Sequence, residues 1–529
     1  MSPWSRRSVL ITALAAVVVL GVGAVFVVRA GAGRQGDALA LPDAVRQVMD
    51  GQRYQHSRWG MLVTDAKTGE VLSSLDPDQL FIPGSTTKLF SVTATWDALG
   101  PDHRFTTPVY KRVEVADGTL AGDLVLVGSG DLVLGGRADG DRIAVSAFDH
   151  MEANSFPTLA QLTPQDPLAG LDSLARQVKD SGVLRIGGQV VVDARLFRSD
   201  NPLSGIPLSP VMVNENVVDV SVSPGTAAGV PAAVTLRPVT SATRLEASVT
   251  TGAEGSAPAV TSVMDADGTI RVTGTVPARG SGVLNTVQVT DAEGYARTAF
   301  VDALRRAGVE VDVEATGPNP VDLLPAKDGY RAEDQVAQLR SAPFSEYAKL
   351  ILKMSHNLGA DTDMCLLAVH RASTDCEDGV AAVGEFLRAH GVDGAGFSFA
   401  DGRGGAAGDL TTPTAATALL RYWTTRPDYQ RLKDSLPILG VDGTIGGDEK
   451  DSPARGRVFA KTGTVAGGDL ANQRVTVQAE TLVGFADAAD GRQLAFAVYV
   501  GNLGVPDVAD ILDVAADLSH IAALVQQRR

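Results

Sequence analysis

The feature that most limits the fold is a change of hydrophobic pattern, which occurs twice along the 529-residue chain. Up to about residue 100, and again from Pro343, apolar residues recur at helical spacing, as at Leu89, Val92 and Trp96. Between these segments, residues 101–330 form mostly short β runs separated by turn residues. That stretch is too long for one small domain, so the sequence predicts two β-rich modules between the helical segments.

Local patterns predict further elements. A hairpin is predicted over residues 59–72 with its turn at Ala66-Lys67-Thr68-Gly69, and a helix is predicted to begin at Ser85. A second hairpin is predicted over residues 260–276, and further strands over 457–464, 482–486 and 494–500. Helical spacing predicts further helices over residues 168–179, 292–307, 344–354, 360–372, 380–390, 412–424 and 505–526.

The amino-terminal sequence predicts that the body of the protein is exported from the cytoplasm. Arg6 and Arg7 precede residues 8–28, which contain no charged residue. A helix of that length spans about 31 Å, close to the roughly 30 Å hydrocarbon core of a bilayer, and the arginines orient the body outside. We expect an uncleaved anchor over residues 1–28 with a linker over 29–44. The alternative is a cleaved signal ending at Ala38-Leu39-Ala40, and the arginine pair partly matches a twin-arginine signal.

Charge and cysteine content exclude several classes. The net charge of −16, from 46 basic and 62 acidic residues, repels polyanions, and no basic cluster offsets it, so no nucleic-acid partner is expected. Two cysteines cannot form a disulfide scaffold or a four-cysteine zinc site, and the histidines show no metal-binding spacing. Outside the cell, Cys365 and Cys376 either pair or remain free.

The first candidate motif is Ser85-Thr86-Thr87-Lys88, which is the one S-x-x-K in the chain. At a helix start, positions i and i+3 share a face, so the Ser85 hydroxyl and the Lys88 amine can touch. A serine becomes a nucleophile when a base takes its proton, and Lys88 can be that base only if its pKa falls from about 10.4. The alternative is that Ser85 is an ordinary helix N-cap.

The second candidate motif is Ser355-His356-Asn357, at a predicted junction between two apolar-faced helices. Such a junction is a rigid mount for polar side chains. Ser199-Asp200-Asn201 has the same S-x-N spacing, but it lies in the β-rich stretch and a proline follows it. Either segment can instead be a cap or a turn, because Ser, Asp and Asn favour both.

The third candidate motif is Lys461-Thr462-Gly463-Thr464, in a strand-like context. A glycine in a strand lets a ligand approach the backbone closely. Lys67-Thr68-Gly69 has the same letters but lies in a predicted turn, where only the glycine's positive φ is needed. The K-T-G letters alone therefore carry no signal in this chain.

Together, S-x-x-K, S-x-N and K-T-G in this order resemble the active-site serine penicillin-binding and β-lactamase-type acyltransferases. The long stretch after the first motif is similar to the D-alanyl-D-alanine carboxypeptidase/endopeptidase family of penicillin-binding-protein-4 type, peptidase family S13. Residues 122–126 and 186–193 and Asp401-Gly402 agree with it, although Arg403 stands where the family usually has serine. The resemblance covers most of residues 45–520.

The resemblance implies an α+β fold. Its catalytic domain, of the serine transpeptidase and β-lactamase type, would be an antiparallel sheet flanked by helices. Residues 45–100 and 331–529 would build this domain, and the β-rich modules of residues 101–330 would be inserted into it.

The resemblance also implies acyl transfer through a covalent intermediate on Ser85, with Lys88 as the proton acceptor. The substrates would be peptidoglycan stem peptides, attacked at the carbonyl of the penultimate D-alanine, and β-lactams would be covalent inhibitors. Ser355 would relay a proton to the leaving amine, and Asn357 would hold the substrate amide. The family needs no cofactor and no metal.

The third motif would complete that site. Lys461 would place positive charge near Ser355 and near the substrate carboxylate. The hydroxyls of Thr462 and Thr464 would bind this carboxylate, and Gly463 would let the substrate approach the backbone. The backbone N–H groups of Ser85 and Thr464 would form the oxyanion hole. Two alternatives stay open: a related serine acyltransferase, either an esterase or a β-lactamase, and a non-catalytic cell-wall-binding protein.

Overall fold

The computed structural model describes residues 41–146, 148–198, 203 and 207–528. The predicted anchor and most of the linker, as well as the S-x-N segment at 199–201, lie outside the described residues. Among the residues described, no helix is both long and apolar enough to cross a bilayer.

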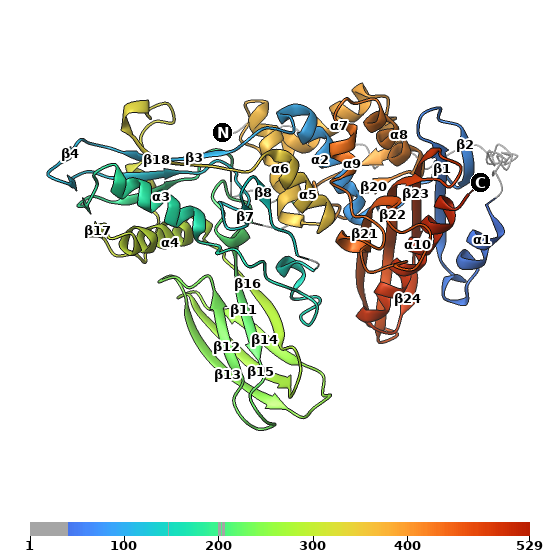
Figure 1. The fold of residues 1–529 in the computed structure, drawn as a ribbon, viewed down its shortest axis with the longest axis horizontal. Helices are drawn as coiled ribbons and strands as arrows, with labels where there is room; N and C mark the ends of the chain where they lie inside the picture. Colours follow the sequence, from blue (N-terminus) through green and yellow to red (C-terminus); the bar gives the residue numbers. More distant parts are fainter. Residues whose placement is uncertain (1–40, 147, 199–202, 204–206, 529) are drawn as a thin grey trace, which may run out of the picture. The chain divides into compact units, whose positions relative to one another are not determined.

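The chain contains both helices and strands, in runs of several strands and runs of several helices (Figure 1). The α-helices are α1 (Asp43–Met49), α2 (Thr87–Leu99), α3 (Ala169–Asp180), α4 (Ala292–Arg306), α5 (Phe344–Lys353), α6 (Asn357–His370), α7 (Cys376–Ala389), α8 (Pro413–Thr424), α9 (Tyr429–Lys433) and α10 (Ile511–Gln526). The strands of three or more residues are β1 (Arg58–Asp65), β2 (Val71–Leu75), β3 (Thr106–Lys111), β6 (Leu124–Val127), β10 (Val190–Asp193), β11 (Val217–Ser223), β12 (Ala233–Arg237), β13 (Arg244–Gly252), β14 (Ala259–Met264), β15 (Thr269–Pro277), β16 (Val283–Gln288), β18 (Gln335–Arg340), β21 (Val458–Asp469), β22 (Arg474–Asp487), β23 (Gln493–Gly501) and β24 (Leu503–Val505).

The largest sheet joins the two ends of the chain. Its order is β2-β1-β23-β22-β21, all pairs are antiparallel, and β24 also pairs with β22. Side chains alternate across it, as a strand requires. In β23, Phe496 and Val498 pack in a cluster with residues of α1 and α10, whereas Ala497 and Tyr499 pack with residues of α2 and α5 to α8. The predicted antiparallel sheet with helices on both faces is thus confirmed.

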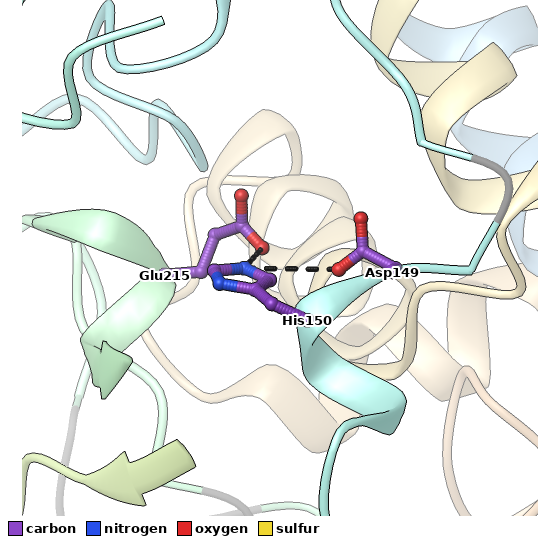
Figure 2. A group of neighbouring side chains, drawn as sticks. All are labelled: Asp149, His150 and Glu215. Carbon is purple, nitrogen blue, oxygen red and sulfur yellow. Dashed lines mark hydrogen bonds and ion pairs between the residues drawn. The ribbon is translucent and has the colours of Figure 1, made fainter. Parts of the chain in front are cut away.

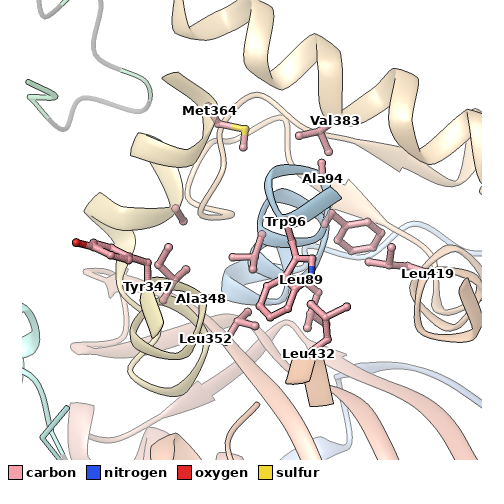
Figure 3. Packing of buried hydrophobic residues seen from close by; sticks show 14 of the residues in the cluster. Leu89, Ala94, Trp96, Tyr347, Ala348, Leu352, Met364, Val383, Leu419 and Leu432 are labelled. Atoms are coloured by element: carbon pink, nitrogen blue, oxygen red, sulfur yellow. The ribbon is translucent and has the colours of Figure 1, made fainter. Parts of the chain in front are cut away.

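Helix α2 lies at the centre of the second cluster (Figure 3). Leu89 and Trp96 are fully buried, and residues of the surrounding helices, among them Leu352, Leu419 and Leu432, pack around them. A helix buried on all sides is held rigidly, so the side chains at its start have fixed positions.

Several smaller sheets lie between β2 and α5 in the sequence. One has the order β10-β6-β3-β18, another β12-β11-β16, and a third β13-β15-β14. The predicted hairpin over residues 260–276 is confirmed as β14 and β15. These sheets share a separate apolar core with α3 and α4. Phe105 and Ser341, which flank β3 and β18, are joined by two hydrogen bonds of 2.9 and 3.0 Å.

Three predicted helix boundaries were wrong. The last helix begins at Ile511 and not at Val505, because Val505 belongs to β24 and a capping box on Asp507 starts a 3-10 turn first. Helices α6 and α7 begin several residues before the predicted starts, because His356 and Asp375 accept backbone N–H groups as N-caps. Cys365 in α6 and Cys376 in α7 form a disulfide.

Candidate active site

The first motif lies in a tight turn and not in a simple helix start. Residues Gly84–Thr86 form a 3-10 turn that leads directly into α2. Pro83 and Thr86 hold the N-cap positions of the turn and of α2, and no side chain in the described part of the chain caps either one. The alternative interpretation of Ser85 as an N-cap is therefore wrong. Instead Lys88 Nζ lies 2.6 Å from Ser85 Oγ, as the i and i+3 spacing predicts.

Three oxygens surround the Lys88 amine. Its Nζ lies 2.6 Å from Ser85 Oγ, 2.7 Å from Asn357 Oδ1 and 3.1 Å from the Arg403 carbonyl oxygen. The amide and carbonyl oxygens can only accept hydrogen bonds, so they take two N–H groups of the amine. In a neutral amine the remaining position is the lone pair, which then faces Ser85 Oγ. This is the arrangement that a base needs to take the serine's proton.

Burial makes the neutral amine accessible at physiological pH. The Lys88 side chain is 0 % exposed. Burial lowers the pKa of Lys88 to about 7, although Glu152, Asp361 and Asp401 favour the charged form. The lowered pKa that Lys88 needs in order to act as a base is therefore provided by its burial.

The second motif lies at the junction of α5 and α6. Ser355 has φ 60, and the His356 N–H donates to the Ile351 carbonyl at 3.0 Å, which ends α5. The next residue, His356, caps α6, so two successive helix signals fix the backbone around Ser355 and Asn357. The short junction explains how Asn357 reaches Lys88 while Ser355 reaches another lysine.

That other lysine is Lys461, in β21. Its Nζ donates to Ser355 Oγ at 2.8 Å and to the Thr462 carbonyl at 2.8 Å. Burial, together with the nearby Lys88, lowers the pKa of Lys461 well below its ordinary value. The Thr462 hydroxyl donates to Thr444 Oγ1 at 2.9 Å. The structure therefore brings all three motifs into one cluster of hydrogen bonds.

Two glycines let the Ser85 turn lie directly against β21. A Cβ on Gly84, whose φ is 51, would lie 2.9 Å from the Thr464 nitrogen. A Cβ on Gly463 would lie 2.3 Å from the Pro83 carbonyl oxygen. The Ser85 turn and Thr464, which are the predicted sources of the oxyanion hole, therefore lie on backbone segments in contact. The other K-T-G, at Lys67, lies in the turn between β1 and β2.

The loop after Asp401 reaches Lys88 through its backbone. The Asp401 carboxylate accepts N–H groups from Arg403, Gly404 and Gly405, and this holds the loop folded. A Cβ on Gly404 would lie 1.8 Å from the Gly84 carbonyl oxygen. Because the contact with Lys88 uses the Arg403 carbonyl, it does not depend on which side chain stands at position 403. The sequence interpretation missed this carbonyl, because a backbone oxygen leaves no mark on the pattern of residue types.

A cavity of about 620 Å³ opens over the motifs. Ser85, Ser355, Asn357, Thr462 and Thr464 line it on one side. The other walls include aromatic, aliphatic and acidic side chains from other parts of the chain: Phe148, Glu152, Phe156, Glu480, Val508 and Leu512. The two glutamates carried no sequence signal, because nothing in their local pattern distinguishes them from other polar residues of β or turn segments.

Burial disfavours the charged form of both cavity glutamates. Burial raises the pKa of Glu480 to about 8, and burial likewise raises the pKa of Glu152. Glu480 lies opposite Thr464 in the pairing of β21 and β22. The cavity therefore places the Ser85 hydroxyl beside apolar walls that carry a few polar groups, as is common in ligand-binding pockets.

The D-Ala-D-Ala carboxypeptidase 3 (S13) family model matches residues 42–522 of this chain. The chain belongs to the S13 family. This S13 carboxypeptidase is 31 % identical, over 77 % of its length and 73 % of the relative, to the D-alanyl-D-alanine carboxypeptidase of Actinomadura sp. (strain R39). It is 24 % identical, over 85 % of its length and 87 % of the relative, to the D-alanyl-D-alanine carboxypeptidase DacB of Haemophilus influenzae.

A solved structure supports the fold of this S13 carboxypeptidase. The crystal structure of penicillin-binding protein 4 (dacB) from Haemophilus influenzae matches with a TM-score of 0.66 at 21 % identity. The match covers 91 % of this chain and 98 % of that one. A second structure of the same Haemophilus protein holds a β-lactam. The predicted family and the multi-sheet α+β fold are therefore confirmed, and the chain is a serine-type carboxypeptidase.

Proposed function

We propose that this S13 carboxypeptidase cleaves peptidoglycan stem peptides through an acyl-enzyme on Ser85. The observation that carries the proposal is the set of three oxygens around Lys88 Nζ, which leaves the lone pair of the neutral amine directed at Ser85 Oγ. Burial and a pKa of about 7 make that neutral form abundant near neutral pH.

In the first step, Ser85 Oγ attacks the carbonyl carbon of the penultimate D-alanine, and its proton passes to Lys88 Nζ. The oxygen of the tetrahedral intermediate binds to the backbone N–H groups of Ser85 and Thr464. Each donor of such a hole is typically worth about 3–4 kcal/mol in the transition state. The turn and strand that carry these N–H groups are in contact, which supports this role.

In the second step, the intermediate collapses and the peptide bond breaks. The Ser355 hydroxyl, which Lys461 holds, gives a proton to the leaving amine of the terminal D-alanine. It takes in return the proton that Lys88 gained in the first step, so Lys88 is neutral again. Lys461 and the Thr462 and Thr464 hydroxyls bind the substrate carboxylate, and Asn357 orients the substrate amide. Water then attacks the acyl carbonyl, with Lys88 as base, and releases the shortened peptide.

Labelling with a fluorescent penicillin tests the acyl-enzyme. We expect wild-type protein to be labelled covalently and Ser85→Ala to remain unlabelled. A β-lactam occupies the related Haemophilus protein, which supports this expectation. A folded wild-type protein that takes no label would contradict the proposal.

The release of D-alanine tests the substrate. A pentapeptide ending in D-Ala-D-Ala is compared with a cross-linked peptide dimer, which separates carboxypeptidase from endopeptidase activity. We expect D-alanine from the pentapeptide. Rapid turnover of a reporter ester or a cephalosporin, with both peptides left intact, would instead favour a related serine acyltransferase.

We also propose that the enzyme works on the outer face of the cell membrane, held by residues 8–28 or exported after their cleavage. The disulfide between Cys365 and Cys376 supports an oxidising compartment. Cell fractionation, with amino-terminal sequencing of the mature protein, tests this. Recovery of the full-length chain in the cytosol would contradict it.

We propose the same division of the chain that the resemblance implies, with a catalytic domain built from residues 45–100 and 331–529. The hydrogen bonds between Phe105 and Ser341 support it, because they bring the two ends of the intervening stretch together. Limited proteolysis tests it: we expect the first cuts within residues 101–330, and early cuts within α2 or β23 would contradict it.

A further inference from the structure

His356 lies between Ser355 and Asn357 and takes no part in the chemistry proposed above. It is 1 % exposed. The Gly359 N–H donates to its Nδ1 at 3.0 Å, which caps α6. An Nδ1 that accepts a hydrogen bond carries no proton, so Nε2 carries it and donates to Glu215 Oε2 at 2.6 Å. Both edges of the ring are therefore fixed.

Glu215 comes from the stretch between β10 and β11, far from the catalytic motifs in sequence. It is 2 % exposed and lies in a turn of three successive residues with positive φ, namely Asn214 (49°), Glu215 (57°) and Asn216 (59°). Residues other than glycine rarely adopt this conformation, and runs of them persist only where the surroundings hold them. Such conformations cluster at functional positions.

A buried network of charges holds Glu215 in place. Both Glu215 oxygens accept hydrogen bonds from Arg137, which also pairs with Asp149 at 2.7 Å. His150 Nε2 lies 2.9 Å from Glu215 Oε2 (Figure 2). Its Nδ1 lies 2.6 Å from Asp219 Oδ1. Every member is nearly fully buried, so the network is rigid.

Asp149, His150 and Glu215 are close enough together to suggest a metal site, but their chemistry argues against one. Their possible ligand atoms all lie within 4.8 Å of one another. However, the guanidinium of Arg137 already pairs with both carboxylates. Although burial opposes the charged form, Glu215 and Asp219 raise the pKa of His150 to about 10, and an imidazolium has no lone pair for a metal.

We propose that Glu215 is a positioning residue for the active site and acts through His356. The Glu215–His356 hydrogen bond fixes the backbone on which Ser355 and Asn357 are mounted. It thereby maintains the hydrogen bond between Asn357 Oδ1 and the Lys88 amine and the one between Ser355 Oγ and Lys461. The inference rests on the proposed acyl-enzyme chemistry, and it gives Glu215, in the β-rich stretch, a part in catalysis that it exerts through His356.

Two variants break this bond from its two ends. In His356→Asn, asparagine still caps α6 but is too short to reach Glu215. In Glu215→Leu, the acceptor is lost while the volume is nearly kept. We expect each to lower the rate of Ser85 acylation by fluorescent penicillin by roughly 10- to 100-fold, as small displacements of catalytic groups do. With a pentapeptide, kcat should fall while KM stays near the wild-type value.

Two matched variants separate positioning from general destabilisation. Asp219→Asn perturbs the same network at His150 but does not touch His356. Glu215→Gln keeps an oxygen that accepts from His356. We expect both to acylate within about threefold of wild type, even where thermal unfolding shows them destabilised. In the His356→Asn background, Glu215→Leu should slow acylation no further.

Two results would overturn this inference and leave the proposed function standing. One is a wild-type acylation rate in both His356→Asn and Glu215→Leu, and the other is an equal loss of acylation rate in Asp219→Asn and His356→Asn. Should either bond-breaking variant fail to fold, the other decides. Absence of label in the folded wild-type protein would instead overturn the proposed function and this inference together.

Discussion

At the scale of single residues, the unusual feature is a pair of buried lysines. Lys88 and Lys461 are both 0 % exposed, and the amine of each is hydrogen-bonded to a serine hydroxyl. Burying two ammonium groups in one site is costly, so the pKa values of both fall. Perturbed groups of this kind mark functional sites more often than structural ones.

The lowered pKa of Lys88 predicts a pH dependence. The base is the neutral amine, so acylation should be slow below pH 7, rise through about pH 7 and level off above it. Acylation rates with fluorescent penicillin between pH 5.5 and 8.5 measure this. Glu480→Gln is the control, because it removes a group whose pKa is about 8 and should leave the rise in place. A flat profile would contradict Lys88 as base.

Replacing Lys88 by arginine tests the same role with a side chain that cannot become neutral. Lys88→Arg keeps a cation that cannot lose its proton in a protein. Acylation should fall by about 100- to 10,000-fold, which is the usual contribution of a general base. Lys67→Arg, in the other K-T-G segment, should leave the rate unchanged. Equal rates in the two variants would rule out a base at position 88.

The close contact of Gly84 with β21 predicts that a small side chain at position 84 slows acylation. Gly84→Ala places a Cβ 2.9 Å from the Thr464 nitrogen, at φ 51. Gly140 is the matched site, because its φ is 62 and a Cβ added there would meet no described atom within 4 Å. Each variant should lose about 1 kcal/mol of unfolding free energy from the positive φ. Only Gly84→Ala should also slow acylation, by at least about tenfold, because only there does the Ser85 turn move from β21.

At the scale of elements, the site depends on where helices begin and end. The positive φ of Ser355 ends α5, and His356 then caps α6, so the serine and asparagine side chains leave the backbone from adjacent helix ends. Helix α6 continues to the disulfide that joins it to α7. The disulfide lies in the middle of the helix and not at its catalytic end.

The disulfide is expected to stabilise the fold without affecting catalysis. It closes a loop with a sequence separation of 11, for which chain entropy predicts roughly 3 kcal/mol. The Cys365→Ser/Cys376→Ser double variant should unfold at lower urea concentration and acylate within about threefold of wild type. Reductant should shift wild-type protein in the same direction and leave the double variant unchanged. A large loss of acylation at full folding would show that the disulfide also positions the site.

At the scale of the whole described chain, the buried apolar residues form three separate cores. Two lie on the opposite faces of the largest sheet and hold the catalytic helices. The third is built from residues between β3 and β18 and contains α3 and α4. The buried Glu215–His356 bond connects the third core to the active site.

Because the cores are separate, a large-to-small substitution in one core should affect the unfolding of that core more than the unfolding of the others. Phe300 is 0 % exposed in α4, and Phe300→Ala should cost about 3–5 kcal/mol in the third core. Of the four tryptophans, Trp59, Trp96 and Trp423 lie in the other two cores, and Trp4 lies outside the described residues. The change of tryptophan fluorescence on unfolding therefore reports mainly on those two cores. Urea unfolding of Phe300→Ala should shift the circular-dichroism transition more than the fluorescence transition. Phe485→Ala should shift fluorescence, and equal shifts in every case would show one cooperative unit.

Much of this organisation follows from local sequence. Helical spacing located α2, α5 and α8 to within a residue or two, and strand patterns located β1 and β23. The starts of α6 and α7 were missed because the caps, His356 and Asp375, act through side-chain geometry that periodicity does not contain. The contact between Ser85 and Lys88 was predictable, because both residues lie within one helical turn.

The sequence by itself therefore determined the family, the fold class and the one contact that lies within a turn. Only the tertiary structure decided what makes Lys88 a base, because its other two oxygens come from positions 269 and 315 residues away. The same holds for the bond from Glu215 to His356, across 141 residues. Burial and long-range hydrogen bonds arise from packing the whole chain, and no short pattern of residues encodes them.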